Sequence, residues 1–207
     1  AYIVWNDQRS GSSQAYAQRV DSNGNIQWTA NGVLIGNGLF TNTAVTDASN
    51  NLIVAYGNRI QKLNTSGVAQ WTAGGVTMFP STPQLPFGDH DPMMVADGSG
   101  GAIVVAPYTA GVNNNNIITQ RVNASGSLLW GASGLIISNS PIHEIRPTLD
   151  SDGNGGAFFT WIRRTTTPST VDDVYAQYVN SAGAIQWTAD GYLVSAVATD
   201  PIINRNG

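Results

Sequence analysis

The sequence predicts an all-β protein built from four similar units, each a small antiparallel sheet of four strands. The first observation is a repeated stretch, "QRVDSNGNIQWTANG", which starts at Gln18 and returns in similar form from Gln61, Gln120 and Gln177. The second is a Gly-rich stretch, "DGSGGAIVVA" from Asp97, which predicts a tight turn followed by a short strand buried on both faces. The third is that no segment shows helical periodicity.

The order of the repeated stretches assigns the four strands of each unit. The first strand leads into the Gly-rich turn, as in "PMMVAD", and the apolar run "GAIVVA" is the second. The third strand ends in "QRV", and we expect the fourth to begin around the Trp. Four short antiparallel strands per unit are typical of a β-propeller blade. We therefore expect one domain over residues 1–207, with blades over 1–36, 37–79, 80–138 and 139–195 and a closing strand over 196–207.

Three residue types recur at fixed places in every unit, and we interpret all three as structural. A Gly four residues before each Trp turns the hairpin between the third and fourth strands. We expect the repeated Gln to hold neighbouring strands by side-chain hydrogen bonds. Buried aromatic rings contribute strongly to packing, so we expect the repeated Trp residues to be buried. These are Trp28, Trp71, Trp130 and Trp187.

The repeats resemble a known class of proteins. The pattern "DG-x-GG-A" followed by "Q-R-V-[DN]-x-x-G-x-x-x-W" is similar to the repeats of large secreted bacterial β-propeller proteins. It is also loosely similar to the tryptophan-docking repeat of quinoprotein-like propellers, which has one more residue between its Asp and its Gly. The resemblance implies a propeller in which the Trp residues dock neighbouring blades, and it implies no particular activity.

The two ends of the chain predict how the ring closes. The stretch "DPIINRNG" from Asp200 aligns with "RPTLDSDG" from Arg146 and is a first strand, whereas "AYIVW" from Ala1 aligns with "AFFTW" from Ala157 and is a second strand. Pairing the two would close a ring of four blades and remove an unpaired edge. The alternative is a fragment of a larger propeller, because the chain starts in mid-strand and we expect it to be a piece of a longer protein.

The composition excludes some function classes. Only 11% of the residues are charged, the net charge is −4, and Lys62 is the one lysine, so no basic cluster for nucleic acid exists. No apolar stretch is long enough to span a membrane. There is no cysteine and thus no thiol chemistry. The many Asn, Ser, Thr and Gly residues suit a secreted bacterial β protein, located outside the cell or on its surface.

The candidate site lies on the face that carries the variable loops, because variable loops on a rigid scaffold commonly carry function. Both histidines and several charged residues fall close to the starts of first strands, and two arginines fall in loops on the same face. We expect these residues around one opening of the central channel. They are His90, Asp91, His143, Glu144, Arg146, Asp200, Arg9 and Arg163. They could bind a metal, or a sugar or acidic ligand, or they could simply satisfy backbone groups at strand ends.

Asp150, Asp152 and Asn154 have the alternating oxygen spacing of a calcium loop. The acidic ligand expected at position twelve of such a loop is missing, so a hairpin turn is the favoured interpretation and no cofactor other than calcium is indicated.

Taken together, these patterns predict an extracellular or cell-surface binding or adhesion module that recognises a glycan or a protein. One alternative is a carbohydrate-active hydrolase or lyase that uses acidic residues at the channel mouth, although no catalytic motif is present. The other is a structural spacer in a large surface protein. The ligand and the flanking domains cannot be inferred from the sequence.

Overall fold

The computed structural model describes residues 1–38, 40–80, 92–111, 114–165 and 171–197. These residues form only strands, turns and loops, as the sequence predicts. The described part of the chain contains no helix that could cross a membrane.

The strands form four antiparallel sheets in which consecutive strands pair with each other. The first sheet contains β1 (Tyr2–Asp7), β2 (Gln14–Arg19) and β3 (Val33–Asn37). The second contains β4 (Phe40–Thr46), β5 (Leu52–Tyr56), β6 (Arg59–Leu63) and β7 (Val76–Thr77). The third contains β8 (Met93–Ala96), β9 (Ala102–Gly111), β10 (Asn114–Val122) and β11 (Leu135–Ser138). The fourth contains β12 (His143–Ser151), β13 (Ala157–Thr165), β14 (Val171–Val179) and β15 (Tyr192–Val197).

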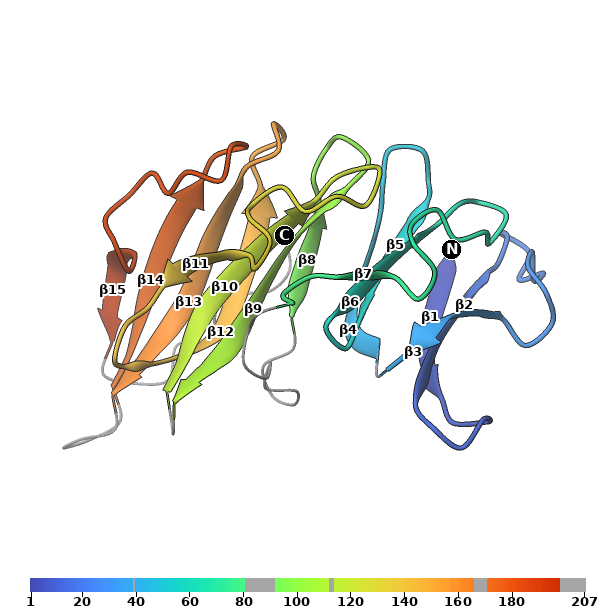
Figure 1. Cartoon of the computed structure of the whole chain (residues 1–207), viewed down its shortest axis with the longest axis horizontal. Coiled ribbons are helices and arrows are strands. Elements are labelled where there is room, and N and C mark those ends of the chain that lie inside the picture. Colours follow the sequence, from blue (N-terminus) through green and yellow to red (C-terminus); the bar gives the residue numbers. More distant parts are fainter. Residues whose placement is uncertain (39, 81–91, 112–113, 166–170, 198–207) are drawn as a thin grey trace.

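The four sheets stand side by side in one row, with the first sheet at one end and the fourth at the other (Figure 1). Strand β8 contacts both β4 and β12, and β1 contacts β4, so the leading strands of the sheets line one side of the row. The predicted closing strand falls almost entirely on residues 198–207, which lie outside the described residues. Ring closure at four blades therefore stays a prediction.

Asp and Asn side chains build the hairpin turns along one edge of the row. Oδ1 of Asp97 accepts hydrogen bonds from the backbone N–H groups of Ser99 (2.8 Å) and Gly101 (2.7 Å). Asn123 does the same for Ser125 (3.0 Å) and Ser127 (2.9 Å). A short polar side chain that pairs with the backbone two and four residues ahead stabilises a turn locally. The same pattern recurs at Asp21, Asn64, Asp47, Asp152 and Asn180.

The repeated Gln makes the predicted side-chain hydrogen bonds, but they hold the turn that carries the Trp rather than a neighbouring strand. In the third sheet, Oε1 of Gln120 accepts from the backbone N–H groups of Arg121 and Trp130, both at 3.0 Å, and its Nε2 donates to the carbonyl of Gly131 at 2.8 Å. Gln120 is fully buried. One amide therefore satisfies three backbone groups that water cannot reach.

The position of the fourth strand differs from the prediction. The Trp lies in a turn, and the last strand of each sheet starts further along the chain, at Val33, Val76, Leu135 and Tyr192. The reason is the set of hydrogen bonds made by the repeated Gln amide, which we call the Gln bracket. It pairs with the backbone of the Trp and so replaces the hydrogen bonds of a strand ladder there.

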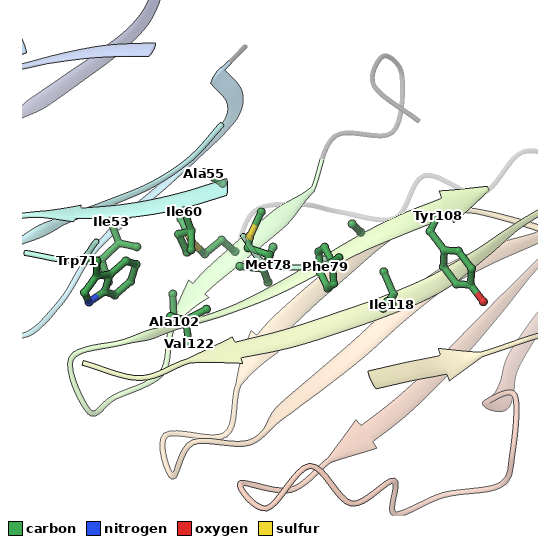
Figure 2. Packing of buried hydrophobic residues seen from close by; sticks show 13 residues of the cluster. Ile53, Ala55, Ile60, Trp71, Met78, Phe79, Ala102, Tyr108, Ile118 and Val122 are labelled. Atoms are coloured by element: carbon green, nitrogen blue, oxygen red, sulfur yellow. The ribbon is translucent and has the colours of Figure 1, made fainter. Parts of the chain in front are cut away.

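Each core cluster fills the space between two neighbouring sheets. Between the second and third sheets, Ile53, Ile60 and Trp71 face Ile118 and Val122, all at most 6% exposed (Figure 2). Two further clusters lie between the first and second sheets and between the third and fourth. The core is thus a series of apolar layers, and each layer is built from side chains of the two sheets on either side of it.

A Trp from one sheet docks onto the hairpin turn of the next. The indole N–H of Trp28 donates to the carbonyl of Thr65 (3.0 Å), that of Trp71 to Ala124 (3.0 Å), and that of Trp130 to Ser181 (3.3 Å). The exposed fractions of these three rings are 8%, 6% and 4%, so the predicted burial is confirmed for them. The ring lies against the Gly of the receiving turn, and the ideal Cβ position on Gly126 is only 2.9 Å from Trp71.

Trp187 is the exception to the prediction, because it is 43% exposed. It belongs to the fourth sheet, which is the last of the described sheets and stands at the end of the row (Figure 1).

Candidate binding site on the variable-loop face

The variable loops lie on the edge opposite the Asp and Asn turns, and the largest described one, residues 8–13, joins β1 to β2 in the first sheet. This connection follows β1 and precedes β2. It contains Gln8, Arg9 and Ser12, all exposed to solvent. It therefore belongs to the face on which the sequence predicts the site.

Arg9 lies over the Tyr16 ring, which belongs to an aromatic pair. Its guanidinium carbon lies 4.3 Å from the centre of the Tyr16 ring, and Tyr16 stacks with Trp5 at 6.0 Å between ring centroids. Asp7 forms an ion pair with the Arg9 guanidinium and also accepts from the backbone N–H of Arg9 (2.8 Å) and from the indole N–H of Trp5 (3.3 Å). Trp5, Tyr16, Arg9 and Asp7 form what we call the first-sheet cluster.

The surroundings of Asp7 favour the ionised form of its carboxyl group. The Arg9 side chain, followed by the Arg9 backbone N–H, holds the pKa of the Asp7 carboxyl well below its usual range. Asp7 thus stays ionised at any ordinary pH. The Arg9 side chain remains 42% exposed, so the guanidinium is both fixed in place and accessible from solvent.

Polar side chains support the rest of the loop. Ser10 Oγ donates to Oε1 of Gln14 (2.8 Å), and Nε2 of Gln14 donates to Oδ1 of Asn37 in β3 (2.8 Å). Nε2 of Gln8 lies 3.4 Å from Ser13 Oγ. These bonds tie the loop to the second and third strands of its own sheet, which fixes its shape without a partner molecule.

A second cluster with the same chemistry lies in the fourth sheet. The Arg163 guanidinium lies 3.8 Å from the centre of the Tyr175 ring, and Tyr175 stacks with Trp161 at 6.3 Å. Oε1 of Glu144 accepts from Nη2 of Arg163 (2.8 Å) and from the Trp161 indole (2.9 Å), and Ser138 Oγ also donates to it (2.7 Å).

The fourth-sheet cluster encloses Glu144, which corrects the expectation that this residue lies at an opening of the central channel. Glu144 is 0% exposed, and its other oxygen, Oε2, has no hydrogen-bond partner among the described residues. Burial raises the pKa of the Glu144 carboxyl, against the opposing effects of Ser138 and Arg163. Because it sits in β12 between two sheets, this carboxylate holds structure and does not face a ligand.

The other predicted residues are dispersed. His143 accepts a hydrogen bond at Nδ1 from the backbone N–H of Asn115 in the third sheet (3.1 Å). Arg146 lies at a register break in β12 with a positive φ of 51°. His90, Asp91 and Asp200 lie outside the described residues.

The predicted residues do not gather around one opening in the described part of the chain. Arg9 belongs to the first sheet, whereas Glu144 and Arg163 belong to the fourth, and these sheets occupy opposite ends of the row (Figure 1). The structure brings Glu144 and Arg163 together as an ion pair, whereas the Arg9 side chain is 42% exposed.

The calcium candidate has the geometry of a hairpin turn. Oδ1 of Asp152 accepts from the backbone N–H groups of Asn154 (2.7 Å) and Gly156 (2.9 Å), and its Oδ2 accepts from the hydroxyl of Tyr178 (2.8 Å). Both oxygens are therefore occupied by donors of the chain itself. Across the described ranges, no group of three or more His, Cys, Asp or Glu side chains is placed to hold a metal ion.

The aromatic members of both clusters were missed by the sequence reasoning. Trp5 and Trp161 end the aligned stretches "AYIVW" and "AFFTW", and a Tyr lies directly opposite each on the neighbouring strand. The alignment of these two Trp residues was the available signal. It was used only to place a strand.

The comparisons with known proteins do not assign the chain to a family. No protein-family model matches the sequence, and no curated protein matches it significantly. The fold and the site define an all-β repeat protein of stacked antiparallel sheets with an exposed aromatic–arginine–carboxylate cluster at one end. The resemblance to secreted propeller repeats stays a prediction.

Proposed function

We propose that the protein is an extracellular binding module that recognises a glycan through the first-sheet cluster. The single observation that carries this proposal is the accessible guanidinium of Arg9, held between the Tyr16 ring and the Asp7 carboxylate. A positioned charged group on a structured loop loses little conformational freedom when it binds a ligand.

The chemistry of this cluster suits sugar hydroxyl and carboxylate groups. A guanidinium has five N–H donors, and the side-chain bond from Arg9 to Asp7 uses Nη2, so further donors remain for a ligand. Asp7 supplies acceptor oxygens next to them, and Gln8 and Ser12 add exposed amide and hydroxyl groups. Adjacent hydroxyls of a sugar ring require such alternating donors and acceptors at short spacing.

The proposed architecture is a β-propeller whose blades are the four sheets. The repeated Trp joint and the row of sheets support this proposal. The sequence predicts two alternative ways to complete the ring: closure at four blades, through pairing of residues 201–207 with β1, or a larger propeller of which this chain is a part. The extracellular or cell-surface location rests on composition and on the resemblance stated above. A hydrolase or lyase would need a convergent pair of exposed carboxylates, and the burial of Glu144 gives that alternative no support within the described residues.

A glycan array of neutral and acidic oligosaccharides tests the proposal. Arg9→Ala should lower binding of the retained glycan at least about tenfold, as for a charged contact worth about 1.5–3 kcal/mol. Arg59→Ala is the matched control, because Arg59 is an exposed arginine on the same edge of the second sheet and donates to the carbonyls of Gly74 and Gly75. Retention of no glycan, or equal binding by Arg9→Ala and wild type, would contradict the proposal.

A further inference from the structure

Neighbouring sheets are joined where the repeat Trp of one sheet docks onto the hairpin turn of the next. Each end of the row carries one half of such a joint. In the fourth sheet, Phe158 is 44% exposed, whereas Ile53 and Ile103, at the same repeat position, are 0% exposed. Trp187 is 43% exposed, against at most 8% for the other repeat Trp residues. Phe158 stacks with Tyr178 at 4.5 Å, and Trp187 lies beside both rings, so the exposed surface is a continuous aromatic patch. This is the donating flank.

The first sheet presents the receiving half. Ile3 is 52% exposed, whereas Val54, Val104 and Phe159 at the same repeat position are 0% exposed. Gly24 is the turn glycine of this sheet. The ideal Cβ positions on Gly67, Gly126 and Gly183 each lie within 3.0 Å of a Trp from the preceding sheet, but nothing lies within 4 Å of that on Gly24. This is the receiving flank.

The first sheet also has an edge that no described strand covers. It contains three strands where the other sheets contain four, and β1 pairs only with β2 among the described strands. A groove of about 860 Å³ lies beside this edge, lined by residues of β1, β4 and β8 that include Tyr2, Val4, Val45 and Val95. An unpaired edge of this kind accepts a further strand.

We propose that the donating flank of one molecule docks against the receiving flank of a second copy, so that two copies close a ring of eight sheets. The Trp187 indole would donate to the carbonyl of Ser22, as its counterparts donate to the residue one after the turn Asn in the next sheet.

The occupant is a second copy because the joint is directional. The internal joints each pair a donating flank with a receiving flank, and one flank of each kind remains exposed in the described part of a single chain. Two donating flanks placed together would leave each indole N–H facing another donor, so like-with-like pairing is disfavoured. The two flanks lie at opposite ends of the row of sheets (Figure 1). A heterologous contact that closes after two copies gives a finite assembly, and eight blades lie within the range of about 4–8 known for propellers.

Sedimentation equilibrium of the intact chain at several concentrations tests the proposal. Wild type should have twice the 21.8 kDa mass of one chain. Ile3→Arg and Trp187→Arg should each weaken dimerisation at least about tenfold, because a charge would be buried at the centre of the contact. Val68→Arg is the control, since Val68 is 57% exposed in an internal sheet and belongs to neither flank. Circular dichroism verifies that each variant is folded.

A mixing experiment distinguishes the proposed head-to-tail contact from other dimers. The Ile3→Arg chain keeps an intact donating flank and the Trp187→Arg chain keeps an intact receiving flank. An equimolar mixture should therefore form a heterodimer that neither variant forms alone. A monomeric wild type, a dimer insensitive to Ile3→Arg, a mixture that stays monomeric, or a ladder of species beyond two copies would each overturn the proposal. Glycan binding by Arg9 is measured separately and does not depend on these outcomes.

Discussion

Replacing a repeat Trp by Ala should cost far more stability at an internal joint than at the end of the row. Trp71 is 6% exposed and donates to the Ala124 carbonyl, whereas Trp187 is 43% exposed. For a side chain of about 200 Å², this difference leaves roughly 70 Å² more of the Trp187 ring already in water. At about 25 cal/mol per Å², the two substitutions should differ by about 2 kcal/mol.

The absolute values follow from the same geometry. Trp71→Ala should lower the free energy of unfolding by about 3–5 kcal/mol, the range for a large aromatic removed from a packed core. It also leaves the Ala124 carbonyl without its donor, which places the expected value at the upper end of that range.

Urea denaturation measures both changes. The comparison is made in an Ile3→Arg background, so that association through the Trp187 flank does not add to its stability. Equal losses for Trp71→Ala and Trp187→Ala, or a loss below about 1 kcal/mol for Trp71→Ala, would refute the inference that burial at the joint sets the stability.

Three further substitutions test other parts of the fold. Glu144→Ala should destabilise by about 3–5 kcal/mol in thermal melts, because it leaves the Arg163 charge buried without its carboxylate; an unchanged melting temperature would contradict the structural role of this pair. Gln120→Ala should cost about 2–3 kcal/mol in urea with an unchanged m-value, since three backbone groups lose their partner; a smaller loss would mean that water replaces the amide. Burial acts to raise the pKa of Asp47, but hydrogen bonds from Lys62 and a neighbouring Asn outweigh this effect, so the pKa is lowered. The ionised Asp47 carboxylate therefore stabilises the fold above about pH 3.9, and this contribution is lost as the pH falls further. Asp47→Asn should therefore show a shallower loss of stability below about pH 4 than wild type, and identical acid profiles would count against this ion pair.

Local patterns in the sequence were sufficient to predict the sheets. The turns depend on an Asp or Asn and a Gly within a few residues, as at Asn64 and Gly67, where φ is 80°. The Gln bracket likewise joins residues ten or eleven positions apart, as between Gln120 and Trp130 or Gly131. Interactions over such short separations recur with the repeat and can be read directly from it.

The candidate site depended on contacts that the repeat does not encode. Glu144 is next to His143 and close to variable loops, which suggested exposure, yet Trp161 and Arg163 from the adjacent strand enclose it. The burial of Trp28, Trp71 and Trp130 was predictable, but the exposure of Trp187 depends on whether a further sheet follows. Side-chain environment between strands is a tertiary property, and a single sequence gives it only indirectly.

The joint between sheets has a consequence for how such a chain can change over generations. Every internal unit carries both an indole for the following unit and a receiving carbonyl and glycine for the preceding one. The contact surface is therefore copied along with the unit whenever the corresponding DNA is duplicated. A newly inserted unit would find compatible neighbours on both sides without further mutation, and its loop on the opposite edge could then diverge. Arrays of this kind can lengthen by whole units while stability changes in nearly equal increments.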